Sequence, residues 1–312
     1  IEQGNIGHAY LFSGPRGTGK TTMARIFARA IGCSNNDIIE IDAASNRGID
    51  DIRQLREGIH SLPFSSPYKM YIIDEVHMLT KEAFNALLKT LEEPPQHVIF
   101  VLATTELHKV LPTVVSRCLG FVFKSPTRTI LKNMIQGIVE QEGFTIDTPS
   151  LDLIAMLGNG SFRDTQGVLQ KLVSYSEDKD ITRDEVALVT GAPSSGIIQN
   201  LLSSINTSDI QEVLNILSQA EDQNIDPYIF LQMVVEGVRR VLYMRFSEDQ
   251  KKSMGEELGE EDFLFYSSLA SQAKNINSSL LETLLGSYQY LHVSFSKYLA
   301  LEIALLKFLE SK

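Results

Sequence analysis

The chain contains only two cysteines, Cys33 and Cys118, among its 312 residues. Two cysteines cannot form the multiple-disulfide framework that stabilises many small secreted proteins. They do not form a Cys-x-x-Cys pair either, so a complete zinc site cannot be built from the cysteines of this chain. This sparse use of cysteine is typical of proteins from a reducing compartment.

Long hydrophobic runs are missing as well. A membrane-spanning helix needs about 18 consecutive apolar residues, whereas the longest apolar run here, residues 98–103, has the length of a strand. Residues 1–6 lack the basic start and apolar stretch that characterise a signal peptide. We therefore expect a cytoplasmic protein that makes no contact with a membrane.

An excess of positive charge is also absent, because the formal net charge is −11 at pH 7. Residues 1–126 hold 13 Lys and Arg against 13 Asp and Glu, whereas residues 127–312 hold 15 against 26. This division suggests two functional halves. It argues against electrostatic binding of nucleic acid over the whole protein surface, since such binding requires many cationic contacts to phosphates.

The first part of the chain alternates between strand-like and helix-like segments. The predicted strands are residues 8–13, 38–42, 71–74, 98–103 and 120–123, and the predicted helices are residues 20–31, 49–59, 81–91 and the short 109–115. Strands that alternate with helices indicate an α/β fold with a parallel sheet covered on both faces. The length and this pattern favour two or three domains.

Helices dominate from Pro126 onward, and we find no convincing strands there. Two pairs, Thr182 with Glu185 and Ser208 with Gln211, have the spacing of a capping box. Asp226 followed by proline is typical of an N-cap and a first helical position.

Domain boundaries are expected near Pro126 and Pro193. The segment 191–196 (GAPSSG) is rich in Gly, Pro and Ser and indicates a linker. We therefore divide the chain into residues 1–125, 126–192 and 193–312.

A glycine-rich motif follows the first predicted strand and opens the first predicted helix. It consists of Gly14, Pro15, Arg16, Gly17, Thr18, Gly19, Lys20 and Thr21, followed by Thr22, and fits the pattern G-x-x-x-x-G-K-[ST]. Glycines let backbone N–H groups close around phosphates, and the helix N-terminus adds a favourable dipole. We expect Lys20 to reach the β- and γ-phosphates of ATP and Thr21 to bind Mg²⁺. The alternative is a glycine-rich turn that matches by chance.

An acidic pair, Asp74 and Glu75, ends the apolar strand at residues 70–73. A buried strand delivers these carboxylates to the edge of the sheet beside the phosphate-binding loop. We expect Asp74 to hold Mg²⁺ through water and Glu75 to orient and polarise an attacking water. A solvated strand end is the alternative. His77, next to the pair, is expected to pack or cap rather than to catalyse.

Three further residues are candidates for the same site. Thr105, preferred over Thr104, ends a strand and could sense the γ-phosphate or the attacking water. Without the other two motifs, an ordinary strand end is the better interpretation of this segment. Arg117 precedes the last strand and could reach into a neighbouring subunit's site as an arginine finger. Arg163 opens a later helix and could fold over the phosphates. Taken alone, each arginine is equally compatible with an ordinary surface position.

Taken in order, the motifs resemble the bacterial DNA polymerase III gamma/tau family. The matching segments are residues 8–22, 40–46 (EIDAASN), 72–79 (IIDEVHML), 84–95 (FNALLKTLEEPP), 102–106 (LATTE), 116–118 (SRC) and 160–164 (GSFRD). Each motif alone is shared by many ATPases, whereas the ordered series is specific. The match is dense over residues 6–172 and thin beyond them.

The resemblance implies an AAA+ core with a five-stranded parallel sheet, a small helical lid and an all-α collar. It implies an ATP-hydrolysing motor of the clamp loader that opens the sliding beta clamp and loads it on primer–template DNA. The implied partners are the delta and delta-prime subunits and further copies of the chain, with ATP and Mg²⁺ as cofactors.

The resemblance also assigns roles to particular residues. It implies that Arg117 acts in trans and that Arg163 is a sensor on the lid side. It places residues 81–91 and 44–48 toward the centre of a ring, where Arg47 is a candidate phosphate contact. A solvated loop arginine is the alternative for Arg47.

One departure from the family concerns zinc. Family members carry a four-cysteine zinc module between the first helix and the strand at residues 38–42. Cys33 matches the first ligand of that module, but the chain then runs almost directly into the strand. The resemblance implies zinc, and this sequence does not supply the ligands.

Three other functions compete with this interpretation. Another AAA+ DNA motor, such as a branch-migration ATPase, should carry a winged DNA-binding domain, whereas the C-terminal part here is acidic and helical. A non-catalytic scaffold subunit should have a degraded loop, whereas Lys20, Thr21, Asp74 and Glu75 are all present. A small-molecule kinase would not need Arg117 in trans.

Overall fold

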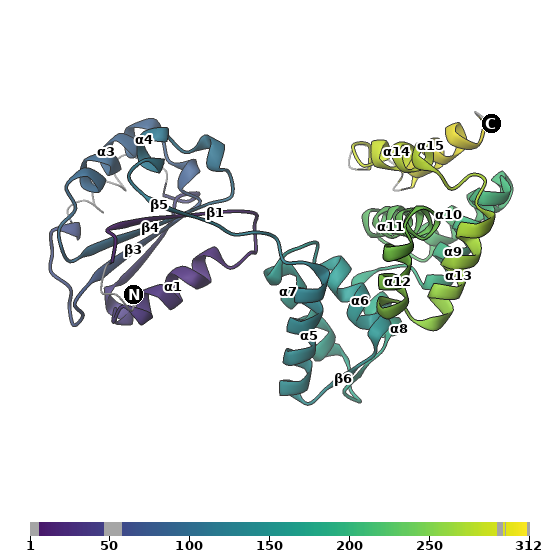
Figure 1. The fold of residues 1–312 in the computed structure, drawn as a ribbon, viewed down its shortest axis with the longest axis horizontal. Coiled ribbons are helices and arrows are strands. Elements are labelled where there is room, and N and C mark those ends of the chain that lie inside the picture. The colour runs from purple at the N-terminus through teal and green to yellow at the C-terminus, as the bar shows by residue number, and fades with distance from the viewer. Residues whose placement is uncertain (1–5, 47–57, 292–295, 297, 311–312) are drawn as a thin grey trace. The chain divides into compact units, whose positions relative to one another are not determined.

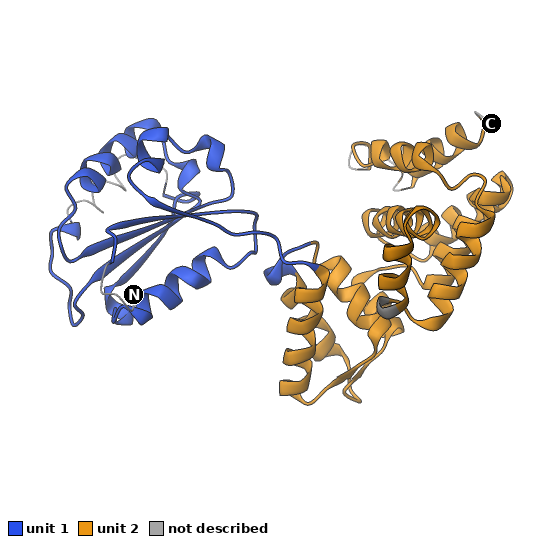
Figure 2. Ribbon diagram, viewed as in Figure 1, with its two compact units in different colours: residues 1–127, 160–164 blue, residues 128–159, 165–312 orange. Residues whose placement is uncertain are grey.

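The computed structural model describes residues 6–46, 58–291, 296 and 298–310. The chain forms two compact units, which are coloured separately in Figure 2. Unit 1 comprises residues 1–127 and 160–164, and unit 2 comprises residues 128–159 and 165–312. The division of the helical part into a lid and a collar at residue 193 falls inside unit 2 and stays a prediction.

Unit 1 is built on a five-stranded parallel sheet, which confirms the predicted fold class. Its strands are β1 (Ala9–Ser13), β2 (Ile38–Asp42), β3 (Lys69–Asp74), β4 (Val98–Thr104) and β5 (Leu119–Val122). Their order across the sheet is β2-β3-β4-β1-β5. β1 therefore lies between β4 and β5, so the loop that follows β1 leaves the sheet beside the end of β4.

Helices cover both faces of this sheet, with α1 (Lys20–Ala30) on one face and α3 (Lys81–Glu92) and α4 (Pro112–Val115) on the other (Figure 1). Successive strand residues point to opposite faces. Met70 and Ile72 of β3 accordingly join the core that contains α1. Tyr71 and Ile73 join the core that contains α3.

Capping residues, glycine and proline set the ends of the helices in unit 1. Gly19 precedes α1 with a left-handed φ of 91°, which glycine adopts without strain. Thr80 caps α3 by accepting a hydrogen bond from the N–H of Ala83. α3 ends at Glu92, just before two prolines, as the sequence predicts.

The helix predicted over residues 109–115 is wrong in its extent. The chain instead forms a 3-10 turn over Leu107–Lys109 and the one-turn helix α4. Leu111 between them is extended, with ψ of 133°, because a residue before proline avoids the helical region. The helix predicted over residues 49–59 lies largely outside the described residues.

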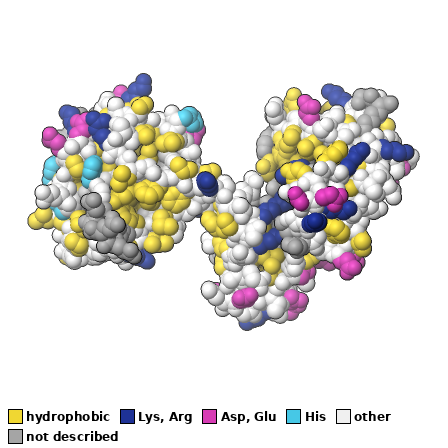
Figure 3. Space-filling model, in the orientation of Figure 1, with side chains coloured by type: hydrophobic (Ala, Val, Ile, Leu, Met, Phe, Trp, Pro, Cys, Tyr) yellow, Lys and Arg dark blue, Asp and Glu magenta, His cyan; other side chains and the backbone are white. Residues whose placement is uncertain are grey.

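The edge strand β5 leaves apolar side chains at the surface of unit 1. Phe121 is 51% exposed and Val122 is 72% exposed. An apolar cavity of about 390 Å³ is lined by Tyr10, Phe12, Met23, Phe27, Phe121, Val122 and Phe123. Figure 3 shows hydrophobic side chains gathered on one face of unit 1.

Unit 2 is mainly helical. Its helices are α5 (Arg128–Glu142), α6 (Thr148–Leu157), α7 (Phe162–Tyr175, whose first residues belong to unit 1), α8 (Arg183–Thr190), α9 (Ser195–Thr207), α10 (Ile210–Asp222), α11 (Pro227–Phe246), α12 (Glu248–Glu257), α13 (Glu260–Gln272), α14 (Ser278–Ser287) and α15 (Leu299–Glu310). The long helix α11 contacts α9, α12, α13 and α14. No helix among the described residues is both long enough and apolar enough to cross a membrane.

Two expectations for the second half of the chain are wrong. β6 (Thr145–Ile146) and β7 (Asp180–Ile181) form a small parallel sheet, and strands of two residues are too short to produce a hydrophobic pattern. Ser208 does not open a capping box. It ends α9 with a left-handed φ of 59°, and the neighbouring Asp209 caps α10 instead.

Other local predictions for this half are confirmed. Thr182 and Glu185 form a reciprocal capping box at the start of α8. Asp226 caps α11 by accepting hydrogen bonds from two backbone N–H groups.

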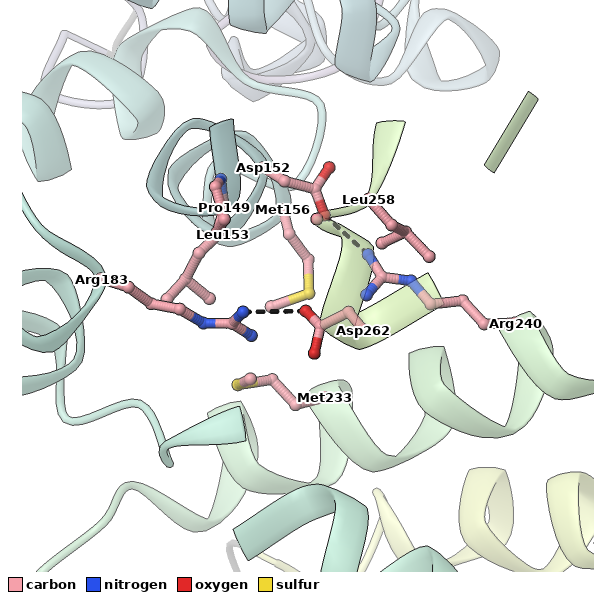
Figure 4. Close-up of a pocket in the computed structure, with 10 residues that line it drawn as sticks. Pro149, Asp152, Leu153, Met156, Arg183, Met233, Arg240, Leu258 and Asp262 are labelled. Carbon is pink, nitrogen blue, oxygen red and sulfur yellow. Dashed lines mark hydrogen bonds and ion pairs between the residues drawn. The ribbon is translucent and has the colours of Figure 1, made fainter. Parts of the chain in front are cut away.

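A small pocket in unit 2 contains charged side chains from four helices (Figure 4). Arg240 of α11 points toward Asp152 of α6 at 2.6 Å, and Lys132 of α5 contacts the same carboxylate at 2.8 Å. Arg183 of α8 and Asp262 of α13 form a second pair at 2.9 Å. These pairs join helices on both sides of the predicted boundary at residue 193.

Burial and charge act in opposite directions on Asp152. Burial disfavours its charged form, but Arg240 and Lys132 outweigh that effect and hold the pKa of Asp152 below its ordinary value. A carboxyl with a depressed pKa stabilises the folded state above its unfolded pKa, and that contribution is lost as the pH falls through the folded pKa.

We therefore expect Asp152→Asn to lower the free energy of unfolding of the protein by about 2–3 kcal/mol near pH 7, because Arg240 and Lys132 would lose the carboxylate that they share. The loss should shrink as the pH falls through the depressed pKa that Asp152 has in the folded protein, because wild-type Asp152 then becomes protonated as well. Urea unfolding followed by circular dichroism of the helices measures both effects.

Glu140→Gln is the matched control, since Glu140 lies on α5 and is exposed. It should change stability by less than about 0.5 kcal/mol at either pH. An Asp152→Asn protein as stable as wild type at neutral pH would contradict the assignment of a stabilising ion pair.

Candidate functional site

The loop after β1 is held in place by backbone contacts to two neighbouring segments. The N–H of Gly14 donates to the carbonyl of Thr104 at 3.2 Å, which ties the loop to the end of β4. A Cβ at Gly14 would overlap the carbonyl of Phe123, so only glycine fits there. The loop therefore leaves the sheet at a fixed point between β4 and β5.

Lys20, the first residue of α1, folds back over this loop. Its Nζ donates to the carbonyl oxygens of Gly14 and Pro15, both at 2.8 Å, and the residue is 6% exposed. Burial lowers the pKa of Lys20, an effect that the nearby carboxylates of Glu75 and Asp74 oppose. The ammonium group thus lies in a partly dehydrated position close to two carboxylates.

Thr21 and Asp74 join the loop to the acidic pair. The Thr21 hydroxyl donates to Asp74 Oδ2 at 2.7 Å, although 53 residues separate the two. This contact arises because β3 and β1 are parallel strands whose carboxyl ends meet at one edge of the sheet. The two segments that the sequence singled out therefore converge.

Glu75 leaves the end of β3 in an unusual backbone conformation. Its φ is 48°, in the left-handed region that residues other than glycine rarely adopt. Its Oε2 accepts hydrogen bonds from the N–H of Thr105 at 3.2 Å and from the Thr105 hydroxyl at 2.9 Å. The structure thus places Thr105, rather than Thr104, against the acidic pair.

The segment 160–164 brings Arg163 to unit 1. The N–H of Phe162 donates to the carbonyl of Gly17 at 2.9 Å, and Ser161 Oγ accepts from the N–H of Asp164 at 3.2 Å at the start of α7. The Arg163 side chain is exposed, and its charge adds to the lowering of the Lys20 pKa. Arg163 therefore lies within electrostatic reach of the loop.

Arg117 makes its contacts elsewhere in unit 1. Its guanidinium donates to Glu92 Oε1 at 2.7 Å and to the carbonyl of Thr113 at 2.8 Å. The Arg117 side chain is 35% exposed and that of Glu92 is 49% exposed. Arg117 therefore lies outside the cluster around Lys20. In an exposed ion pair of this kind, one partner is readily exchanged for another.

The remaining predicted loop residues differ in their surroundings. Thr18 is buried, and its hydroxyl donates to the carbonyl of Pro15 at 2.9 Å. The side chains of Arg16 and Thr22 are exposed. Arg47 lies outside the described residues.

Cys33 does not fit a metal site. Its side chain is buried, its thiol donates to the carbonyl of Tyr68 at 3.3 Å, and burial raises its pKa to about 11. A zinc ligand must be a thiolate, which this environment disfavours. In the part of the chain that the structure describes, no cluster of three or more His, Cys, Asp or Glu residues could hold a metal ion.

His77 and Glu106 belong to the site, although sequence analysis assigned neither a functional role. His77 Nδ1 lies 2.9 Å from the Thr104 hydroxyl and 3.3 Å from Glu75 Oε2. Its Nε2 lies 3.1 Å from Glu106 Oε2. The sequence indicated these two residues only by their position, because each lies within two residues of a predicted site residue along the chain.

A phosphate-binding loop after β1 and an acidic pair after β3, on this five-stranded sheet, define a P-loop protein of the AAA+ class. Solved structures of Thermotoga maritima RuvB, described as a Holliday junction branch migration motor, are similar. The TM-score is 0.51 at 21% identity, over 65% of this chain and 70% of that chain. At such low identity, the likeness shows only that the two proteins share a fold.

Two family models match parts of this chain. A family model described as "DNA polymerase III subunits gamma and tau domain III" matches residues 181–312. A model described as "DNA polymerase III, delta subunit" matches residues 36–127.

Curated relatives match a larger share of the chain. The DNA polymerase III subunit tau of Bacillus subtilis is 41% identical over 261 residues, covering 77% of this chain and 46% of that protein. The gamma/tau subunit of Mycobacterium tuberculosis is 36% identical over 273 residues, covering 80% of this chain and 47% of that protein. The chain therefore belongs to the DNA polymerase III gamma/tau family, and it spans about half the length of these relatives.

The glycine positions of the loop yield a stability prediction. Gly17 and Gly19 both have left-handed φ, 72° and 91°, so alanine at either costs about 1–2 kcal/mol of backbone strain. Only at Gly17 would the added Cβ overlap the Ser161 hydroxyl. We expect Gly17→Ala to destabilise the protein by about 1–3 kcal/mol more than Gly19→Ala.

Urea unfolding followed by circular dichroism measures that difference without nucleotide. Hydrogen exchange of the Phe162 amide, which bonds to Gly17, should accelerate in Gly17→Ala and stay unchanged in Gly19→Ala. Equal behaviour of the two variants would show that segment 160–164 does not pack against the loop.

Proposed function

We propose that this chain is the ATP-hydrolysing motor subunit of the DNA polymerase III clamp loader. ATP binding lets the assembly open the ring-shaped beta clamp and place it on primed DNA during replication, and hydrolysis releases both. The observation that carries this proposal is the convergence of Lys20 and Thr21 with Asp74 and Glu75 at one sheet edge.

The site suits a magnesium nucleotide. Thr21 and Asp74 present a hydroxyl and a carboxylate 2.7 Å apart, and hard oxygen ligands of this kind are those that Mg²⁺ prefers. Thr21 and Asp74 would hold this ion, which would supply positive charge to neutralise the nucleotide phosphates. Lys20 exchanges its bonds to the Gly14 and Pro15 carbonyls for phosphate oxygens, while the N–H groups of the loop surround the phosphates.

Glu75 and Thr105 act on the attacking water. The Glu75 carboxylate orients and polarises that water, and Thr105, which donates to the same carboxylate, senses the water or the γ-phosphate. These two residues therefore form the hydrolytic part of the site.

Two arginines contribute positive charge. Arg163 approaches from the start of α7 and contacts the phosphates of its own chain. Arg117 leaves Glu92 and reaches the site of a neighbouring copy, where it stabilises the charge of the transition state. Because the ion pair with Glu92 is weak and exposed, breaking it costs little free energy.

The proposed partners follow from the family. They are the delta and delta-prime subunits, further copies of this chain, the beta clamp and primer–template DNA, in the cytoplasm and away from membranes. Arg47 remains a candidate DNA contact. Zinc is not part of the proposal, because the buried thiol of Cys33 does not suit it.

A branch-migration ATPase is the alternative. The fold shared with RuvB is compatible with this alternative, but the likeness covers only 65% of this chain. The match of residues 181–312 to the gamma/tau domain III favours the clamp loader. A non-catalytic scaffold subunit is disfavoured by the contacts of Lys20, Thr21 and Glu75 in the site.

We expect weak ATP turnover by the isolated chain and stimulation when delta, delta-prime, the beta clamp and primed DNA are all present. A phosphate-release assay with and without clamp and DNA measures this effect. Stimulation by a branched DNA junction in the absence of a clamp would favour the alternative function.

Two variants separate binding from turnover in that assay. Lys20→Ala should weaken Mg-ATP binding by about 10- to 100-fold, because it removes charge-assisted hydrogen bonds. Glu75→Gln should bind Mg-ATP normally and lower turnover by about 100-fold or more. Equal loss of binding in both variants would contradict the assigned roles.

Arg117→Ala should retain ATP binding and lower the turnover of the assembly by about 1,000-fold or more. Mixing Arg117→Ala chains with Lys20→Ala chains should restore part of the turnover, since the Lys20→Ala chain supplies an intact Arg117 to its neighbour. Turnover of the mixture no higher than that of the separate variants would indicate that Arg117 does not act in trans.

Arg25→Ala is the matched control for this variant. Arg25 also forms an exposed ion pair in unit 1, with Glu40 at 2.6 Å. Its removal should leave turnover within about twofold of wild type, because such surface pairs contribute little.

A further inference from the structure

His77 lies two residues after Glu75, in a 3-10 turn over Val76–Met78. Its side chain is 5% exposed, and its two ring nitrogens have different partners. Nδ1 faces the Thr104 hydroxyl at 2.9 Å and Glu75 at 3.3 Å, and Nε2 faces Glu106 at 3.1 Å. A buried imidazole is thus held from both sides.

Both partners of the imidazole are themselves held in place. The Thr104 Oγ1, which lies 2.9 Å from His77 Nδ1, also accepts a hydrogen bond from the N–H of Glu106 at 3.0 Å. His77 Nε2 lies 3.1 Å from the Glu106 carboxylate. Lys109, at 2.7 Å, holds that carboxylate from the other side.

This network confines the carboxylate of Glu75. Its Oε2 accepts both hydrogen bonds from Thr105 and lies against the imidazole edge of His77. The left-handed backbone of Glu75 is strained, and such strain persists only where surrounding contacts enforce it. His77, two residues further on and fixed by Thr104 and Glu106, supplies such a contact.

We propose that His77 is a positioning residue, anchored by Thr104 and Glu106, that fixes the carboxylate of Glu75 in the direction required to orient the attacking water. His77 itself touches neither nucleotide nor water. The inference rests on the proposed ATP hydrolysis and deepens it, because it explains how the hydrolytic carboxylate is held in place.

We expect His77→Ala to lower the kcat for ATP by about tenfold in the assembly with partner subunits, clamp and primed DNA. A displacement of about 1 Å of a catalytic group can cost as much as 100-fold. The Kd for Mg-ATP should stay within about twofold, because His77 is not part of the phosphate-binding loop. Phosphate release and titration with a fluorescent ATP analogue measure the two quantities.

Two conservative variants test which ring nitrogen matters. The amide of His77→Asn can replace Nδ1 and should restore most of the kcat. The amide of His77→Gln reaches toward the position of Nε2 and should restore less. If kcat instead follows the melting temperature across all three variants, His77 only fills space in the core and the proposal is wrong.

A double-mutant cycle connects His77 to Glu75. Once Glu75→Gln is present, adding His77→Ala should lower the residual turnover by less than twofold, because no carboxylate remains to be positioned. Multiplication of the two separate losses would overturn the proposal. The control is His108→Ala, whose side chain is 76% exposed and lies 4.0 Å from Glu106, and it should leave kcat unchanged.

The outcomes also separate this inference from the proposed function. A wild-type assembly that neither binds nor hydrolyses ATP would remove the motor function itself. A wild-type assembly with stimulated turnover, together with a His77→Ala variant of equal kcat, would remove only the role of His77.

Discussion

The hydrogen bond between Thr21 and Asp74 is the contact on which the site depends, and it exists because the strands of the sheet are parallel. β1, β3 and β4 end at the same edge, so the loop after β1, the acidic pair after β3 and the hydroxyls after β4 become neighbours. In an antiparallel sheet, adjacent strand ends would point to opposite edges.

The site also relies on backbone conformations that regular structure does not provide. Gly14 lies so close to Phe123 that no side chain fits, and Gly17 makes room for segment 160–164. Glu75 adopts the left-handed region without being glycine. Its neighbours must offset that strain, which connects the packing of Thr104, Thr105 and His77 to the direction of the Glu75 carboxylate.

Charged groups serve different purposes in the two units. In unit 2, Asp152 and Asp262 are paired with arginines inside a pocket, so their charges stabilise the contacts between helices. In unit 1, Lys20 bonds to neutral carbonyl oxygens, and Arg117 is paired at the surface. The contacts of Lys20 are easily exchanged for phosphate oxygens, which suits a loop that binds an anionic ligand.

The sequence by itself determined the parallel five-stranded sheet, the loop from Gly14 to Thr21 and the acidic pair, because apolar periodicity and glycine spacing are local patterns. Only the tertiary structure decided that segment 160–164 packs on Gly17, that His77 bridges toward Glu75 and Glu106, and that two-residue strands pair in unit 2. Those contacts join segments that are far apart in the sequence, and a local sequence pattern does not specify how such segments pack together.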